Sequence, residues 1–243
     1  MEKDLLKSFE PKKELNPNVW NGKDGKSKLK PEIRERLLDI AYEYLEFLDV
    51  DIVVTDIILT GSLSNYNWSK YSDFDLHIVA NFSQYPQNQL DLYEKIFNLK
   101  KMIFNDKHDI TIKGYEVELY VQNETETHFS SGVYSVLFDE WANVPKKENV
   151  SIDKELIKEK AKQWMNTINE LLDSIQDEDA QVAKKMIQKY KDKIKKYRTC
   201  GLEKDGEYSI ENLVFKILRR SGYIEKLYKQ GDEIIDKKLS MNQ

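Results

Sequence analysis

The chain has 243 residues, enough for one domain of ordinary size or for a medium domain fused to a smaller one. Apolar residues make up 40% and charged residues 33%, which is typical of a folded globular protein and unlike a disordered chain. The sequence has no apolar run long enough to span a membrane, and its charged first ten residues do not resemble a signal peptide. We therefore expect a cytoplasmic protein that makes no membrane contact.

The cysteine and histidine content limits the kinds of metal site that the chain can build. One cysteine excludes an intrachain disulfide and a cysteine-built zinc site, and three scattered histidines disfavour a histidine cage. A bound metal would therefore be held by carboxylate oxygens, the ligands that suit Mg²⁺ and Mn²⁺. The net charge is −5, and the acidic excess lies in residues 1–150, whereas residues 151–243 are mildly basic.

The first part of the chain predicts an arm, a helix and a strand. Residues 1–30 are polar, with scattered proline and glycine and no apolar period, and indicate an irregular arm that Trp20 would anchor. Pro31 stands where a helix would begin, and apolar residues recur every three or four positions from Ile33 to Leu48. Residues 50–62 are rich in β-branched side chains, which predicts a buried strand that ends at Gly61.

Further strands and one helix are expected before residue 146. The apolar run from Leu76 to Ala80 predicts a second buried strand, and residues 88–104 return to helical spacing. Residues 108–122 alternate on both sides of Lys113-Gly114, which is typical of a β-hairpin. Residues 132–141 would form one more strand, and the lysine-rich segment that follows indicates a linker.

The remainder of the chain is helical by pattern. Apolar residues recur at helical spacing in three stretches, residues 157–175, 182–197 and 209–239. The last stretch is expected to break near Ser221-Gly222. The fold class is therefore α+β, with an α+β domain over residues 31–146 and a helical domain over residues 151–243.

Two aspartates open the second predicted strand. Asp73 and Asp75 are two positions apart, so their side chains share one face of the strand, whereas Phe74 points to the core. Like charges at that distance repel each other unless a cation lies between them, and the pair therefore indicates a divalent metal site. His77 follows on the same face, where a neutral, hydrogen-bonded histidine is the simpler interpretation and a substrate contact is the alternative.

A third carboxylate is expected on a neighbouring strand. The second strand of the predicted hairpin has its apolar side chains on one face and Glu116 and Glu118 on the other. Glu118 is in mid-strand between apolar neighbours, where an unpaired carboxylate would be costly, whereas Glu116 is nearer the turn. We therefore favour Glu118 as the third metal ligand and keep Glu116 as the alternative.

The strand-to-helix turn at Gly61-Ser62 has the composition of a phosphate-binding turn. Glycine lets the backbone approach a phosphate closely, the amides that follow point outward from a helix N-terminus, and the Ser62 hydroxyl adds a donor. The alternative is an ordinary helix start with a serine cap.

Taken in order, these features resemble the nucleotidyltransferase superfamily, which includes DNA polymerase β, poly(A) and CCA-adding polymerases, kanamycin nucleotidyltransferase and oligoadenylate synthase. The resemblance covers residues 31–140 and depends on the apolar strand ending in Gly61-Ser62, the Asp73-x-Asp75 strand and the later acid Glu118. It is closest to small nucleotidyltransferase-domain proteins of tailed phages. The fold that it implies is a mixed β-sheet with flanking helices, followed here by a C-terminal helical bundle.

The resemblance implies a Mg²⁺-dependent nucleotidyltransferase that uses two metal ions, Mg²⁺ or Mn²⁺. Such an enzyme transfers a nucleoside monophosphate from an NTP to a hydroxyl of RNA, a protein or a small molecule, and releases pyrophosphate. Asp73 and Asp75 would hold both ions, and Glu118 would complete the site and help to deprotonate the acceptor. Many members have aspartate as the third acid, so Glu118 either holds its ion further from the strand or acts mainly as a base.

Phosphate-binding candidates come from both parts of the chain. The resemblance assigns the outer phosphates to Gly61 and Ser62, and Ser72, next to Asp73, joins them as a nucleotide-binding candidate. The basic stretch 184–198 keeps an apolar stripe, so its lysines are first of all a solvated face. The alternative is a contact with the triphosphate or with RNA, for which the candidates are Lys184, Lys185 and Lys189.

Two other functions fit the sequence less well. A non-catalytic nucleotide-binding or antitoxin-like module with the same fold is disfavoured, because a degenerate site usually loses an acid and all three are present. A nucleotide-sugar glycosyltransferase also uses Asp-x-Asp, but only 72 residues precede Asp73, too few for the long nucleotide-binding half of that fold. The acceptor, the preferred base and the oligomeric state stay open.

Overall fold

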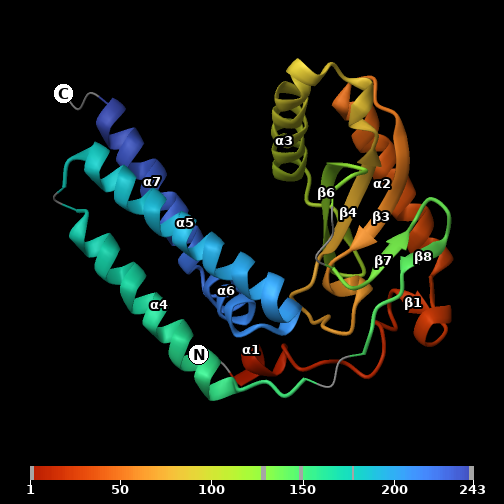
Figure 1. Ribbon diagram of the computed structural model, residues 1–243, viewed down its shortest axis with the longest axis horizontal. Coiled ribbons are helices and arrows are strands. Elements are labelled where there is room, and N and C mark those ends of the chain that lie inside the picture. The colour runs from red at the N-terminus through yellow and green to blue at the C-terminus, as the bar shows by residue number, and fades with distance from the viewer. Residues whose placement is uncertain (1–2, 127–129, 148–149, 177, 241–243) are drawn as a thin grey trace. The chain divides into compact units, whose positions relative to one another are not determined.

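The computed structural model describes residues 3–126, 130–147, 150–176 and 178–240, and the chain divides into two compact units (Figure 1). Ser8–Asn149 form the sheet unit, which contains the β-strands. Met1–Lys7 and Val150–Gln243 form the helical unit. The short helix α1 (Lys3–Lys7) therefore belongs with the C-terminal helices, although it comes first in the chain.

A six-stranded mixed sheet forms the centre of the sheet unit, in the order β5-β6-β4-β3-β7-β8. Its strands are β3 (Val54–Thr60), β4 (Phe74–Ala80), β5 (Thr111–Ile112), β6 (Tyr115–Asn123), β7 (Val133–Ser135) and β8 (Glu140–Asn143). The β4–β6 pair is parallel and the other pairs are antiparallel. The predicted α+β fold class, with a mixed sheet, flanking helices and a C-terminal helical part, is confirmed.

Helices α2 (Pro31–Leu48) and α3 (Leu90–Lys107) pack with one face of the sheet in a single apolar core. The helix face predicted from the spacing of apolar residues is buried, as the full burial of Leu37 and Tyr44 shows. The core also takes Phe74 and Leu76 from β4 and Leu119 from β6. Because side chains alternate along a strand, the residues between these point to the opposite face of the sheet.

The predicted hairpin is confirmed, with Ile112 opposite Tyr115. Lys113 (φ 52°) and Gly114 (φ 82°) both have left-handed backbone conformations, as a two-residue hairpin turn of the common type requires. A single strand over residues 132–141 is wrong, because this segment contains β7 and the start of β8, joined by a turn. The turn depends on Asp139 (φ 58°), whose carboxylate accepts a hydrogen bond from Tyr134.

Residues 8–30 pack into the core of the sheet unit. Trp20 is buried, donates its indole N–H to the carbonyl of Leu63 at 2.8 Å, and stacks on Trp141 with ring centroids 4.6 Å apart. A small antiparallel pair, β1 (Trp20–Asn21) and β2 (Lys28–Leu29), orders this segment. Short 3-10 helices complete the unit at Asp24–Lys26 (η1), Ser62–Ser64 (η2), Phe82–Gln84 (η3) and Gln87–Gln89 (η4).

Among its described residues, the helical unit contains α1 and four longer helices that pack on one another. They are α4 (Lys154–Ser174), α5 (Ala180–Asp205), α6 (Ile210–Arg220) and α7 (Tyr223–Leu239), with the 3-10 helix η5 at Gly206–Tyr208. The expected break lies between α6 and α7, at Gly222 with φ 74°. In the described part of the chain, every helix is too short or too polar to span a membrane.

Candidate active site

Three carboxylates meet where the parallel strands β4 and β6, labelled in Figure 1, begin to pair. Asp73 directly precedes β4, Asp75 is its second residue, and Glu118 is the residue opposite Asp75 in the parallel pair. Each side chain offers one carboxylate oxygen, and these three atoms all lie within 4.8 Å of one another. Glu116, the alternative third acid, is exposed and lies opposite Thr111 of β5, outside this cluster.

The donor set fits a hard divalent cation. All three ligand atoms are oxygen, all three side chains are only partly exposed, and each is a carboxylate. Negative charges gathered so closely repel one another, and a divalent cation between them would offset that repulsion. Mg²⁺ and Mn²⁺ prefer such all-oxygen sites, so the cluster suits the metals expected from the sequence.

Gly61 lies against one of these carboxylates. Its φ is 73°, a conformation that side-chain-bearing residues rarely adopt, and a Cβ atom on it would lie 1.8 Å from Oδ2 of Asp75. The sequence predicts this glycine as a close approach to phosphate. The structure adds a second reason, because any side chain at this position would occupy the space of the Asp75 carboxylate.

The two serines expected near the phosphates lie beside each other. Ser62 donates its hydroxyl to Ser72 Oγ at 2.7 Å, and Ser72 Oγ also accepts the backbone N–H of Ser69 at 2.9 Å. The segment that follows Gly61 is the short 3-10 helix η2. The structure thus brings Gly61, Ser62 and Ser72 to the edge of the carboxylate cluster.

Asn65 holds this turn in place, although it is not among the site residues expected from the sequence. The side chain is 3% exposed, and its amide donates to the Gly61 carbonyl at 2.7 Å and to Ser130 Oγ at 2.9 Å. Its Oδ1 accepts the hydroxyl of Ser131 at 2.7 Å. One asparagine thus joins the turn after β3 to the segment before β7, and nothing in the polar sequence around Asn65 signals these contacts.

A row of polar side chains continues from the carboxylates along the same sheet face. His77 is hydrogen-bonded through both ring nitrogens, with Nε2 3.3 Å from Thr60 Oγ1 and Nδ1 on Gln122 Oε1. Both ring nitrogens thus have partners within the protein, which agrees with the simpler interpretation of His77 as a hydrogen-bonded histidine. The ring of Tyr120 stacks on His77 with centroids 4.7 Å apart.

Tyr120 also contacts the cluster itself, because its hydroxyl donates to Glu118 Oε2. Burial raises the pKa of Tyr120, and the hydrogen bond to Glu118 and the nearby negative charges of Glu118, Asp75 and Asp73 raise it further. The hydroxyl therefore stays protonated and acts as a donor. The sequence analysis does not identify Tyr120, although its position two residues after Glu118 places it on the same strand face.

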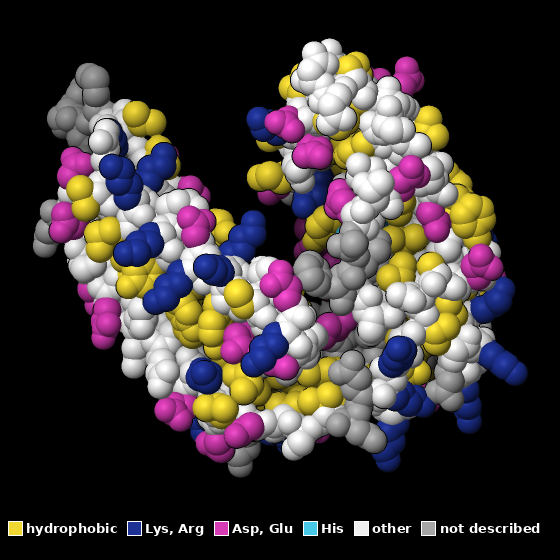
Figure 2. Space-filling view, viewed as in Figure 1, with side chains coloured by type: hydrophobic (Ala, Val, Ile, Leu, Met, Phe, Trp, Pro, Cys, Tyr) yellow, Lys and Arg dark blue, Asp and Glu magenta, His cyan; other side chains and the backbone are white. Residues whose placement is uncertain are grey.

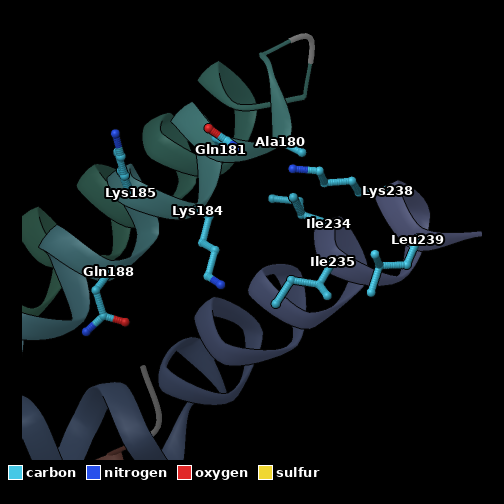
Figure 3. Close-up of a pocket in the computed structure, with 9 residues that line it drawn as sticks. All are labelled: Ala180, Gln181, Lys184, Lys185, Gln188, Ile234, Ile235, Lys238 and Leu239. Carbon is cyan, nitrogen blue, oxygen red and sulfur yellow. The ribbon is translucent and has the colours of Figure 1, made fainter.

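The three lysine candidates lie on α5, in the helical unit, and are exposed. Lys184 extends from α5 toward α7 and, with Lys185, lines a cavity of about 600 Å³ (Figure 3). The walls also include Ile234, Ile235 and Lys238 of α7. On the face drawn in Figure 2, basic side chains are spread along the helical unit with acidic ones between them. Their contact with phosphate or RNA stays a prediction.

Comparison with known proteins gives one match. Residues 38–140 match the family model described as "Nucleotidyltransferase domain", and this range contains Gly61, Ser62 and the three carboxylates. The match supports the nucleotidyltransferase superfamily for this part of the chain. No curated protein and no solved structure matches the chain. The helical unit lies wholly outside the matched residues.

Proposed function

We propose that this protein is a divalent-metal-dependent nucleotidyltransferase that transfers a nucleoside monophosphate from an NTP to a hydroxyl group. The observation that carries the proposal is the convergence of three carboxylate oxygens, from Asp73, Asp75 and Glu118, to within 4.8 Å of one another. The match of residues 38–140 to the nucleotidyltransferase domain supports it. The phage-type subgroup named above depends on the sequence resemblance alone.

The proposed reaction is an in-line displacement at the α-phosphate. The acceptor oxygen forms a bond to the α-phosphorus, the bond from that phosphorus to the bridging oxygen of the β-phosphate breaks, and pyrophosphate leaves. Bound Mg²⁺ or Mn²⁺ stabilises charge on the attacking and leaving oxygens in this kind of chemistry. Asp73 and Asp75 would hold the metal, and Glu118 would complete the site and accept the acceptor proton.

The residues around Gly61 would hold the outer phosphates. Gly61 has no side chain to keep a phosphate away from the backbone. Ser72 Oγ accepts hydrogen bonds from Ser62 and from the amide of Ser69, and within the described residues its own hydroxyl proton would be left to donate to a ligand. Lys184, Lys185 and Lys189 are proposed as additional cationic contacts to the triphosphate or to an RNA acceptor.

The test uses purified full-length protein with each labelled NTP in turn, Mg²⁺ or Mn²⁺, and total RNA or cell lysate as the source of acceptors. We expect label to be incorporated with pyrophosphate release, and we expect both to be lost in Asp73→Ala. Asp106→Ala, which removes an exposed aspartate of α3, is the matched control and should retain activity.

The outcomes separate the proposed function from its main alternative. NTP binding without pyrophosphate release would support a non-catalytic nucleotide-binding module. The absence of both turnover and metal–NTP binding, with every acceptor, would overturn the proposal. The labelled product would also identify the acceptor class and the preferred base.

A further inference from the structure

The third carboxylate of the cluster has a dedicated hydrogen-bond donor. Tyr120 is two residues after Glu118 on β6, and its hydroxyl donates to Glu118 Oε2. Glu118 lies opposite Asp75 in the parallel strand pair, so this hydrogen bond acts on a carboxylate that faces the other two acids. The donor comes from the same strand as Glu118, which fixes the distance between their backbones.

The ring of Tyr120 is held from two sides. It stacks on His77 of β4 with an interplanar angle of 24°, and the Lys101 ammonium of α3 lies 4.3 Å from its centroid. His77 is itself held through Gln122 and Thr60. Contacts from two further strands and one helix therefore fix the position of the tyrosine hydroxyl before any ligand binds.

A glutamate needs such a support more than an aspartate does. Its side chain has one more rotatable bond, and ordering that bond on ligand binding costs conformational entropy. A hydrogen bond to one carboxylate oxygen limits rotation at the end of the side chain. Groups that orient a metal ligand in this way typically contribute about 10- to 100-fold to metal affinity.

We propose that Tyr120 is a positioning residue, which holds the Glu118 carboxylate opposite Asp75 so that the three acids are arranged before the metal binds. This deepens the proposed function, and only its effect on turnover rests on that function. Tyr120 takes no part in bond making. It compensates for the length of Glu118 at a position where a shorter acid would need less support.

The experiment is Tyr120→Phe, which keeps the stacked ring and removes only the hydroxyl. Mn²⁺ affinity of the full-length protein, measured by titration calorimetry without nucleotide, should fall about tenfold. Tyr134→Phe is the matched control, because Tyr134 is also buried in the sheet and donates its hydroxyl to a carboxylate, that of Asp139, at 2.6 Å. It should lower stability without changing Mn²⁺ affinity.

Two further measurements separate positioning from a general loss of structure. In the Glu118→Gln background, Tyr120→Phe should change Mn²⁺ affinity little, because the carboxylate that it orients is gone. If NTP turnover is observed, Tyr120→Phe should raise the Mn²⁺ concentration for half-maximal rate and leave the rate at saturating Mn²⁺ nearly unchanged.

Equal Mn²⁺ affinities in the wild type and Tyr120→Phe would overturn the proposal, as would equal losses in Tyr120→Phe and Tyr134→Phe. A wild-type protein that binds no Mn²⁺ without nucleotide would overturn this proposal, whereas the proposed function is decided by turnover and metal–NTP binding. A protein that binds Mn²⁺ through a Tyr120-dependent site and yet transfers no nucleotide would support the positioning role and contradict the proposed function.

Discussion

A Cβ atom on Gly61 would overlap the Asp75 carboxylate, at 1.8 Å from Oδ2 and 2.8 Å from Cγ. Thr60, the last residue of β3, pairs with Asp75 of β4, so the chain turns away directly beside that side chain. The absence of a side chain at Gly61 therefore leaves the space in which Asp75 approaches Asp73 and Glu118. The glycine and the metal ligand are two parts of one arrangement.

Gly61→Ala should destabilise the protein and disrupt the cluster. The positive φ and the displaced carboxylate together should lower the free energy of unfolding by roughly 3 kcal/mol, because both the strain and the overlap must be relieved. Urea unfolding measures this loss, and Mn²⁺ titration of the folded variant should show affinity at least about tenfold weaker.

Gly114→Ala is the matched control for that variant. Gly114 also has a positive φ, of 82°, but nothing lies within 4 Å of the position of its Cβ atom. Gly114→Ala should lose only the unfolding free energy that a positive φ costs an alanine, about 1 kcal/mol, and its metal affinity should not change. The double variant Gly61→Ala/Asp75→Ala should recover part of the lost stability, and equal losses at both glycines would contradict the overlap.

Asp73→Asn should have opposite effects with and without metal. In EDTA at low ionic strength, removing one of three neighbouring negative charges should raise the free energy of unfolding by about 1 kcal/mol. Added Mn²⁺ should stabilise the wild type and leave the variant unchanged, because only the wild type keeps the full ligand set. Urea unfolding with and without Mn²⁺ measures both effects.

Salt provides the control for the charge effect. At an ionic strength of about 1 M the advantage of Asp73→Asn in EDTA should shrink, because the Debye length falls to about 3 Å. Asp106→Asn, at an exposed position of α3, should show neither effect. A variant that is less stable than the wild type in EDTA would indicate that Asp73 contributes hydrogen bonds that outweigh the repulsion.

Asn65→Ala should loosen the turn that carries Gly61. The substitution removes the buried amide that joins the Gly61 carbonyl to Ser130 and Ser131, and should cost about 2–3 kcal/mol of unfolding free energy. Asn81→Ala is the comparison, because Asn81 only caps the short helix η3. Its replacement should cost about 1 kcal/mol of unfolding free energy. Chemical denaturation measures both, and an equal or smaller loss at Asn65 would contradict the role given to it.

Sequence patterns identify the three acids as candidate metal ligands because alternate residues of a strand point to the same face. Asp73 and Asp75 share a face by spacing alone, and Glu118 is favoured over Glu116 because of its apolar neighbours. The parallel pairing that puts Glu118 opposite Asp75 is a long-range contact, and local periodicity carries no information on it. The resemblance to a known superfamily, and not the strand pattern, therefore led to the mixed sheet.

Contacts between distant segments account for the features that sequence patterns do not reveal. Trp20 is the residue expected to anchor the N-terminal segment, but its partner Trp141 is more than a hundred residues away and does not follow from the sequence. Asn65 acts through partners near residue 130, and Tyr120 acts through His77 and Lys101. Each of these roles depends on a partner from another element, and composition at the position itself does not identify it.

Asp139→Asn should weaken the β7–β8 turn in a pH-dependent way. Burial alone would raise the pKa of the Asp139 carboxyl, but hydrogen bonds from Lys28 and Tyr134 and the positive charges of Lys28 and Arg34 outweigh it, and the pKa is lowered from 3.8. A carboxyl whose pKa is lowered in the folded state stabilises the protein at every pH above its unfolded-state pKa. This stabilisation is lost as the pH falls through the folded-state pKa.

At pH 7, Asp139→Asn should therefore lose about 1 kcal/mol of unfolding free energy. The difference from the wild type should narrow below about pH 4. Urea unfolding between pH 7 and pH 3 measures it, and a constant difference over that range would show that the shape of the side chain matters and its charge does not.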